Sequence, residues 1–144
     1  MLGQGFAITP LPNTFSGGSV VDVYRDPLIG SQGPAVAAAA RTFAGTGYAY
    51  MQFSVLGQAA VNPGRPDRVR SSVFYSLYGM LDRGVKRMIC SELVVRAYAA
   101  AGVTLRVTLW PTMRAIGDTS QDFLMDFTTP TMLSLSPDLQ KLNA

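Results

Sequence analysis

The sequence predicts an α+β fold, because segments with a helical pattern are interleaved with a few short segments typical of strands. Its 144 residues suit one domain with a single hydrophobic core. Hydrophobic residues make up 48% of the chain and charged residues 15%, a balance that excludes an intrinsically disordered protein.

The first part of the chain is expected to contain two strands and two helices. Short strands are predicted over Gln4 to Ile8 and over Ser19 to Arg25, the second because it alternates and is rich in Val and Tyr. An alanine-rich helix is predicted from Ala35 to Ala44, with a proline in its first turn and a glycine after its end. A further helix is expected from about Tyr50 to Ala60.

The second part begins with a loop, "NPGRPDRVRSS", which is the best candidate for an exposed insertion. A helix is predicted from Cys90 to Ala101, with Gly102 as its C-cap. A strand is predicted over Thr104 to Leu109. The last part, "DFLMDFTTPTMLSLSPDL", alternates loosely and is expected to end in a turn or short helix.

The residue counts exclude several kinds of site. One cysteine cannot form an intrachain disulfide, so the redox compartment is undetermined. The chain has no histidine, and zinc, copper and non-haem iron sites depend on His and Cys. The nine acidic residues form no spaced cluster of the EF-hand kind. We therefore expect no metal and no other cofactor.

The charge pattern gives weak information on partners and location. The segment from Arg65 to Arg106 is basic, but it has no aromatic interleaving and no reader motif, so we expect a solvated surface and no nucleic-acid partner. No signal peptide is visible. The stretch from Thr42 to Val61 lacks charges and leaves a membrane-associated protein as a weaker alternative to buried structure in a soluble protein. Compartment and oligomeric state are not predicted.

Cys90 is the residue with the clearest chemical potential, because it lies in the first turn of its predicted helix. A helix N-terminus stabilises a thiolate and an oxyanion, whereas a free cysteine that is buried is only a small apolar side chain. With 3.6 residues per turn, Arg96 and, less clearly, Glu92 are expected to fall outside the face that points to the interior or to a groove. That face is expected to contain Cys90, Leu93, Val94, Ala97 and Ala101.

Four segments resemble those of one known family. "CSELVVRAYAAAGVTL" resembles the nucleophile segment of the circularly permuted, NlpC-type papain-like cysteine amidases. "VVDVYRDP" and "VAAAARTFAGTGYAYMQF" resemble the strand, helix and Gly-x-x-Tyr turn that precede it in that family, and "TTPTMLSLSPDL" resembles its closing segment. With gaps, the matches run in the family's order from about Val20 to Leu139.

The resemblance implies a single permuted papain-like domain over residues 1–144, with helices packed on a small antiparallel sheet. It implies that Cys90 is the nucleophile and that Tyr48 lines the groove beside it. The implied substrates are amide or peptide bonds, often in cell-wall peptides, while relatives act on lipid acyl groups.

This sequence departs from the family pattern because the histidine strand that precedes the cysteine helix is missing. Histidine takes the thiol proton and returns one to the leaving amine, so its loss predicts weak or no turnover by this chain alone. A domain incomplete at its N-terminus, a degenerate domain, or a base donated by a second chain are the three explanations. Tyr24, Tyr48 and Asp22 are substitutes for the base only by elimination. Whether the chain is an enzyme therefore stays open, with a non-catalytic binding or structural module as the alternative.

Overall fold

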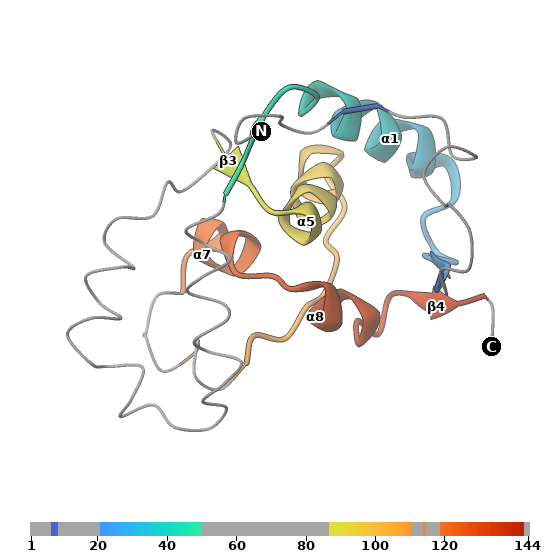
Figure 1. The fold of residues 1–144 in the computed structure, drawn as a ribbon. Coiled ribbons are helices and arrows are strands. Elements are labelled where there is room, and N and C mark those ends of the chain that lie inside the picture. Colours follow the sequence, from blue (N-terminus) through green and yellow to red (C-terminus); the bar gives the residue numbers. More distant parts are fainter. Residues whose placement is uncertain (1–6, 9–20, 50–86, 111–113, 115–118, 143–144) are drawn as a thin grey trace.

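The computed structural model describes residues 7–8, 21–49, 87–110, 114 and 119–142. These residues form helices and very short strands, which confirms the α+β class (Figure 1). The elements in chain order are β1 (Tyr24–Arg25), the 3-10 helix η2 (Gly30–Gln32), α1 (Gly33–Thr42), β2 (Gly47–Tyr48), β3 (Arg87–Met88), α5 (Cys90–Ala100), α7 (Gln121–Asp126), α8 (Pro130–Ser134) and β4 (Gln140–Lys141).

Helix α5 is the centre of the described fold. Figure 1 shows α1 on one side of it and α7 and α8 on the other, and α5 contacts all three helices. Its end is a Schellman motif: the N–H of Gly102 donates to the carbonyl of Ala99 and that of Val103 to Tyr98, both at 2.9 Å. Gly102 has φ +74°, a conformation that glycine adopts without a steric penalty. The helix ends one residue before the predicted Ala101, and Gly102, predicted as the C-cap, follows the C-cap residue Ala101.

Helix α1 covers α5 and begins and ends two residues before the predicted range of Ala35 to Ala44. Its proline lies in the first turn, where a missing N–H costs no helical hydrogen bond. A turn that includes Gly45, at φ +85°, then leads to β2. The predicted helix from Tyr50 to Ala60 and the predicted loop over residues 62–72 lie outside the described residues.

Helices α7 and α8 replace the loosely alternating segment expected near the C-terminus. The Ser120 hydroxyl accepts from the N–H of Phe123 at 3.2 Å, and the Thr129 hydroxyl accepts from that of Met132 at 3.2 Å. Each hydroxyl therefore caps a helix N-terminus. The rings of Phe123 and Phe127 are buried with their centroids 4.8 Å apart. The expected alternation was wrong because two N-caps nine residues apart define two short helices, whereas the expected turn or short helix near the end of the segment is present.

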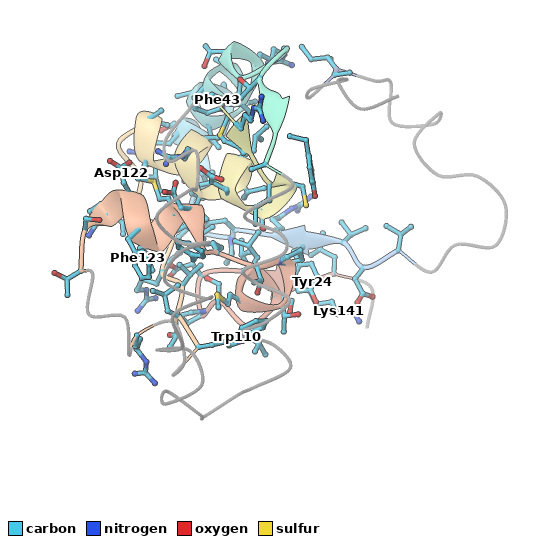
Figure 2. All side chains as sticks on the ribbon, turned by 60° about the vertical axis from the view of Figure 1, so that its left-hand side comes forward. Tyr24, Phe43, Trp110, Asp122, Phe123 and Lys141 are labelled. Atoms are coloured by element: carbon cyan, nitrogen blue, oxygen red, sulfur yellow. The ribbon has the colours of Figure 1, made fainter. Side chains whose placement is uncertain are left out.

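The described strands pair in two small sheets of different direction. β1 and β4 are antiparallel, and Figure 2 shows the paired residues Tyr24 and Lys141 side by side. β2 and β3 are parallel, with Tyr48 opposite Met88. The pair that leads into α5 is therefore parallel, whereas a small antiparallel sheet was expected there.

Two of the predicted strands differ from the structure. Of the segment predicted from Ser19, residues 21–23 are not strand, and only Tyr24–Arg25 is. Thr104 to Leu109 is not a strand either, although Leu105 and Leu109 are buried on one side as the alternation predicts. The N–H of Arg106 donates to the Asp138 carboxylate at 2.7 Å, so this segment is held by a side chain rather than by a neighbouring strand. Ala7 and Ile8, at the end of the first predicted strand, are also not strand.

Candidate functional site

Cys90 is the first residue of α5, directly after β3 and one extended residue, Ile89. The strand before it is fixed by its pairing with β2, which continues in a 3.0 Å hydrogen bond from the N–H of Ala49 to the carbonyl of Met88. Ile89 and Met88 are both buried in the core. Strand pairing thus holds the chain directly before the first turn of α5, while the Cys90 thiol is exposed.

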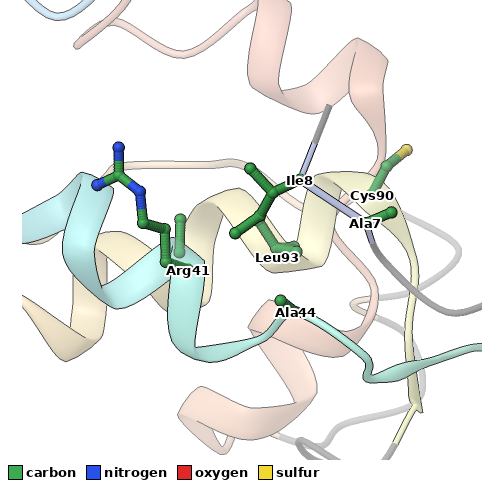
Figure 3. Close-up of a pocket in the computed structure, with 7 residues that line it drawn as sticks. Ala7, Ile8, Arg41, Ala44, Cys90 and Leu93 are labelled. Carbon is green, nitrogen blue, oxygen red and sulfur yellow. The ribbon is translucent and has the colours of Figure 1, made fainter. Parts of the chain in front are cut away.

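Cys90 forms part of the wall of a cavity of about 310 Å³ between α1 and α5. In Figure 3 its sulfur lies at one end of the lining residues and the Arg41 guanidinium at the other, with Ile8 and Leu93 between them. No carboxylate of the described residues pairs with Arg41. The cavity is lined by Ala7, Ile8, Ala40, Arg41, Ala44, Cys90 and Leu93.

This cavity combines an apolar wall with one thiol and one cationic group. Apolar side chains bind hydrocarbon or peptide side chains, and a guanidinium binds carboxylates with two parallel hydrogen bonds. The first-turn amides of a helix point away from its end and lack partners within the helix. The side chain of Ile89, at the N-cap, has no acceptor to offer them.

The buried face of α5 differs from the predicted one. Glu92 is fully buried and Arg96 is 7% exposed, although both were expected to fall outside the buried face. Leu93 and Val94 are only half-buried. The prediction was wrong because α7 contains acidic residues that pair with Arg96, so that Arg96 and Glu92 face the core rather than the solvent. The buried residues of α5 are Ser91, Glu92, Val95, Arg96, Ala97 and Tyr98.

Arg96 joins α5 to α7 through two carboxylates of α7 and also pairs with Glu92 of its own helix. Its guanidinium lies 2.7 Å from Glu92 Oε1, 2.6 Å from Asp126 Oδ1 and 3.1 Å from Asp122 Oδ1. Asp122 is exposed, whereas Asp126 is buried with Glu92. We call Glu92, Arg96, Asp122 and Asp126 the Arg96 cluster. In this cluster the two buried acids, Glu92 and Asp126, surround the one buried base, Arg96, on the core side of α5.

The pKa of Glu92 is raised to about 8: burial raises it most, the hydrogen bond with Arg96 opposes this, and a hydrogen bond with the Asp126 carboxyl group adds to it. One guanidinium cannot balance two carboxylates in the same buried place, so Glu92 retains a proton near neutral pH. Glu92 Oε2 also accepts a hydrogen bond from the N–H of Ile89 at 3.3 Å. The carboxyl group therefore fixes the residue immediately before Cys90.

Ser91 fixes the same turn from the other side. Its hydroxyl donates to the carbonyl of Thr128 at 2.6 Å, in the segment between α7 and α8. No local sequence signal indicates this contact, because its partners are 37 residues apart and the turn between α7 and α8 was not predicted. Together Ser91 and Glu92 hold the first turn of α5. Cys90, which lies between Ile89 and Ser91 in the chain, stays exposed.

The other residues singled out from the sequence lie apart from this cavity. Tyr48 is half-buried in β2 and is not part of the cavity wall that contains Cys90. Asp22 pairs with Lys141 at 2.8 Å, and Tyr24 lies in β1 on a second cavity. None of the three substitute bases considered from the sequence therefore lines the Cys90 cavity.

Within the described part of the chain, no group of three His, Cys, Asp or Glu side chains is arranged to hold a metal ion. Among the same residues, no helix has the length and apolar character needed to cross a membrane. Most of the charge-free stretch from Thr42 to Val61 lies outside them.

Comparison with protein-family models, with curated proteins and with solved structures gave no match to this chain.

Proposed function

We propose that this chain is a permuted papain-like domain in which Cys90 is the nucleophile of an acyl-transfer reaction. One observation carries the proposal: the thiol is exposed at the first turn of an eleven-residue helix, on the wall of a mostly apolar cavity. The resemblance of "CSELVV" to the family's nucleophile segment points to the same atom.

The reaction begins with attack of the Cys90 thiolate on an acyl carbon. The carbonyl oxygen then becomes negative, and amides at the start of α5 are suited to stabilise it. Arg41 is suited to hold a substrate carboxylate at the other end of the cavity. Peptides, including the cell-wall peptides that the resemblance implies, carry such groups. The proposed substrate is therefore an acyl or peptidyl group with a carboxylate.

The absence of histidine determines which leaving groups this chain can expel. An amine must be protonated before it leaves, and general acid–base help of this kind contributes about 10²–10⁴-fold in rate. A thiolate or phenolate leaves without that proton. Cys90 should thus accept acyl groups from thioesters and activated esters, release them slowly, and hydrolyse amides poorly.

Trapping of the acyl-enzyme tests this proposal. Folded protein is mixed with an aryl ester or a thioester, and its intact mass is followed with time. We expect one acyl group per chain, located on Cys90, the one cysteine of the sequence, and faster than on the urea-unfolded chain. Cys90→Ala should acquire none. Added imidazole should speed release of the acyl group, because it supplies the missing base.

A substrate-selective control uses the guanidinium of the cavity. Arg41→Gln should slow acylation by a thioester that carries a carboxylate, and should leave acylation by an uncharged thioester unchanged. Arg106→Gln is the matched control, since Arg106 is an exposed arginine outside the cavity. Equal acylation of folded and unfolded chains would contradict the proposal.

The second candidate function is a non-catalytic binding module, and the lack of any histidine favours it. In that case the cavity holds a peptide carboxylate and the thiol takes no part. Peptide binding that is lost in Arg41→Gln, together with no acylation of Cys90, is the result that would select this candidate.

A further inference from the structure

A second cavity, of about 360 Å³, lies between β1, α5 and α8. It uses the side of α5 that carries Val94 and Tyr98, whereas the first cavity uses Cys90 and Leu93. Among the described residues, the two cavities share no wall residue. The described residues that line the second one are Tyr24, Asp26, Val94, Tyr98, Pro130, Leu133, Ser134 and Leu139.

Asp26 is the one carboxylate among these lining residues, and it is buried, with 9% of its surface exposed. Its Oδ1 accepts from the N–H of Leu28 at 2.9 Å, which closes a turn after β1. No lysine or arginine of the described part of the chain pairs with it. A carboxylate held in an apolar wall without a cation is costly, so a bound cation is favoured.

Negative charges near Tyr98 also favour a bound cation in this cavity. Burial raises the pKa of Tyr98, and the negative charges of Asp26 and Asp138 raise it further. Asp138 bonds Arg106, whose side chain is exposed and is not part of the cavity wall. The carboxylates near Tyr98 therefore favour a cation over an anion here, and the aromatic residues Tyr24 and Tyr98 are part of the same wall.

We infer that this cavity binds a small molecule that joins an ammonium group to an aliphatic body. The ammonium group would meet Asp26, and the aliphatic body would pack on Val94, Leu133 and Leu139. Small-ligand cavities start at about 300 Å³ and combine apolar walls with a few polar groups, as this one does. An anion of the same shape is repelled by Asp26, and a neutral analogue leaves the carboxylate without a cation.

This site is independent of the proposed acyl transfer, because it contains neither Cys90 nor Arg41. A ligand here would be held by β1 and α8 as well as by α5, and β1 is in turn paired with β4.

The test compares three ligands of one length: hexylammonium, hexanol and hexanoate. Each is titrated into the whole chain near pH 7, with binding followed by calorimetry and by amide NMR shifts. We expect hexylammonium to bind at least about tenfold more tightly than hexanol, since its charge pairs with the Asp26 carboxylate. Hexanoate should be the weakest of the three.

Asp26→Asn is the decisive variant, because the amide oxygen can still accept from the N–H of Leu28 and preserve the turn. It should remove the preference for hexylammonium over hexanol. Asp22→Asn is the matched control, since this aspartate is half-exposed and outside the cavity wall. It should keep the preference.

Leu133→Trp fills the cavity and should abolish binding of both hexylammonium and hexanol, while thermal unfolding verifies that each variant is folded. It also keeps the inference testable if Asp26→Asn does not fold. Absence of hexylammonium binding, equal binding of all three ligands, or binding unchanged by Leu133→Trp would each overturn the inference.

Discussion

Glu92 makes the interior of this protein sensitive to pH. Its pKa is raised from the unperturbed 4.5 to about 8, mainly by burial. Between these values the folded chain holds a proton that the unfolded chain has released. The stabilising effect of this proton is complete below about pH 4.5 and is lost as the pH rises to about 8.

Glu92→Gln should flatten this pH dependence, because glutamine is neutral at every pH and similar in shape. We expect wild-type stability to fall relative to the variant as the pH rises from about 4.5 to about 8, with no further divergence above that. Urea unfolding at intervals of pH measures this. Asp122→Asn is the control, because Asp122 contacts the same arginine from an exposed position. Parallel wild-type and Glu92→Gln curves would contradict the assignment of the proton to Glu92.

Single residues were predictable from the sequence where their role is local. The first-turn position of Cys90 follows from the helix signals around it, and the structure places it there. The burial of Glu92 and Arg96 was not predictable, because it depends on Asp126, 30 residues after Arg96. A periodicity argument assigns charged residues to the solvent unless their partners are known.

At the scale of elements, the Arg96 cluster fastens α7 to α5. Arg96→Met should destabilise the fold by about 3–5 kcal/mol, since removal of one partner leaves two buried acids without their cation. The expected signature is a lower urea midpoint near neutral pH.

Arg106→Met is the matched control for that prediction. Arg106 bonds Asp138 as closely as Arg96 bonds its acids, but its side chain is 65% exposed. Exposed ion pairs contribute little because water screens them. A loss of stability in Arg106→Met equal to that in Arg96→Met would show that burial of the Arg96 cluster is not what matters.

The C-terminal end of α5 offers a second test of an element. Gly102→Ala should cost about 1–2 kcal/mol, because alanine at φ +74° enters the left-handed region. Gly33→Ala, in the first turn of α1, has an ordinary helical φ of −52° and only a 3.8 Å contact with Ile29, so it should be neutral or stabilising. Thermal unfolding of both variants measures the difference. Equal effects of the two would argue against the Schellman end.

Elements with their own start and stop signals were predicted best. Helix α5 has a glycine end and α1 has a proline start, and both were placed within two residues. The segment from Thr104 to Leu109 has the alternation of a strand, but a strand also needs a neighbour, which a periodicity cannot supply. The parallel pairing of β2 with β3 joins residues about 40 apart and was equally beyond local signals.

For the whole molecule, α5 is the element on which both proposed sites depend. Its first turn presents Cys90 to one cavity, Val94 and Tyr98 line the other, and Glu92 and Arg96 anchor it between them in the core. The α+β class followed from the sequence, whereas the two cavities arise from packing of segments distant in the chain. Because the Arg96 cluster supports the first turn, Arg96→Met should also slow acylation of Cys90, which the intact-mass experiment measures.

The central claim is that the fold makes Cys90 a better nucleophile than an ordinary cysteine. The most direct test is the rate constant for its alkylation by iodoacetamide near pH 6.5, measured for the native chain and for the chain unfolded in urea. We predict that the native thiol reacts several-fold to about tenfold faster, because a helix N-terminus stabilises the attacking thiolate. A native thiol that reacts at the same rate as the unfolded one, or more slowly, would contradict the account.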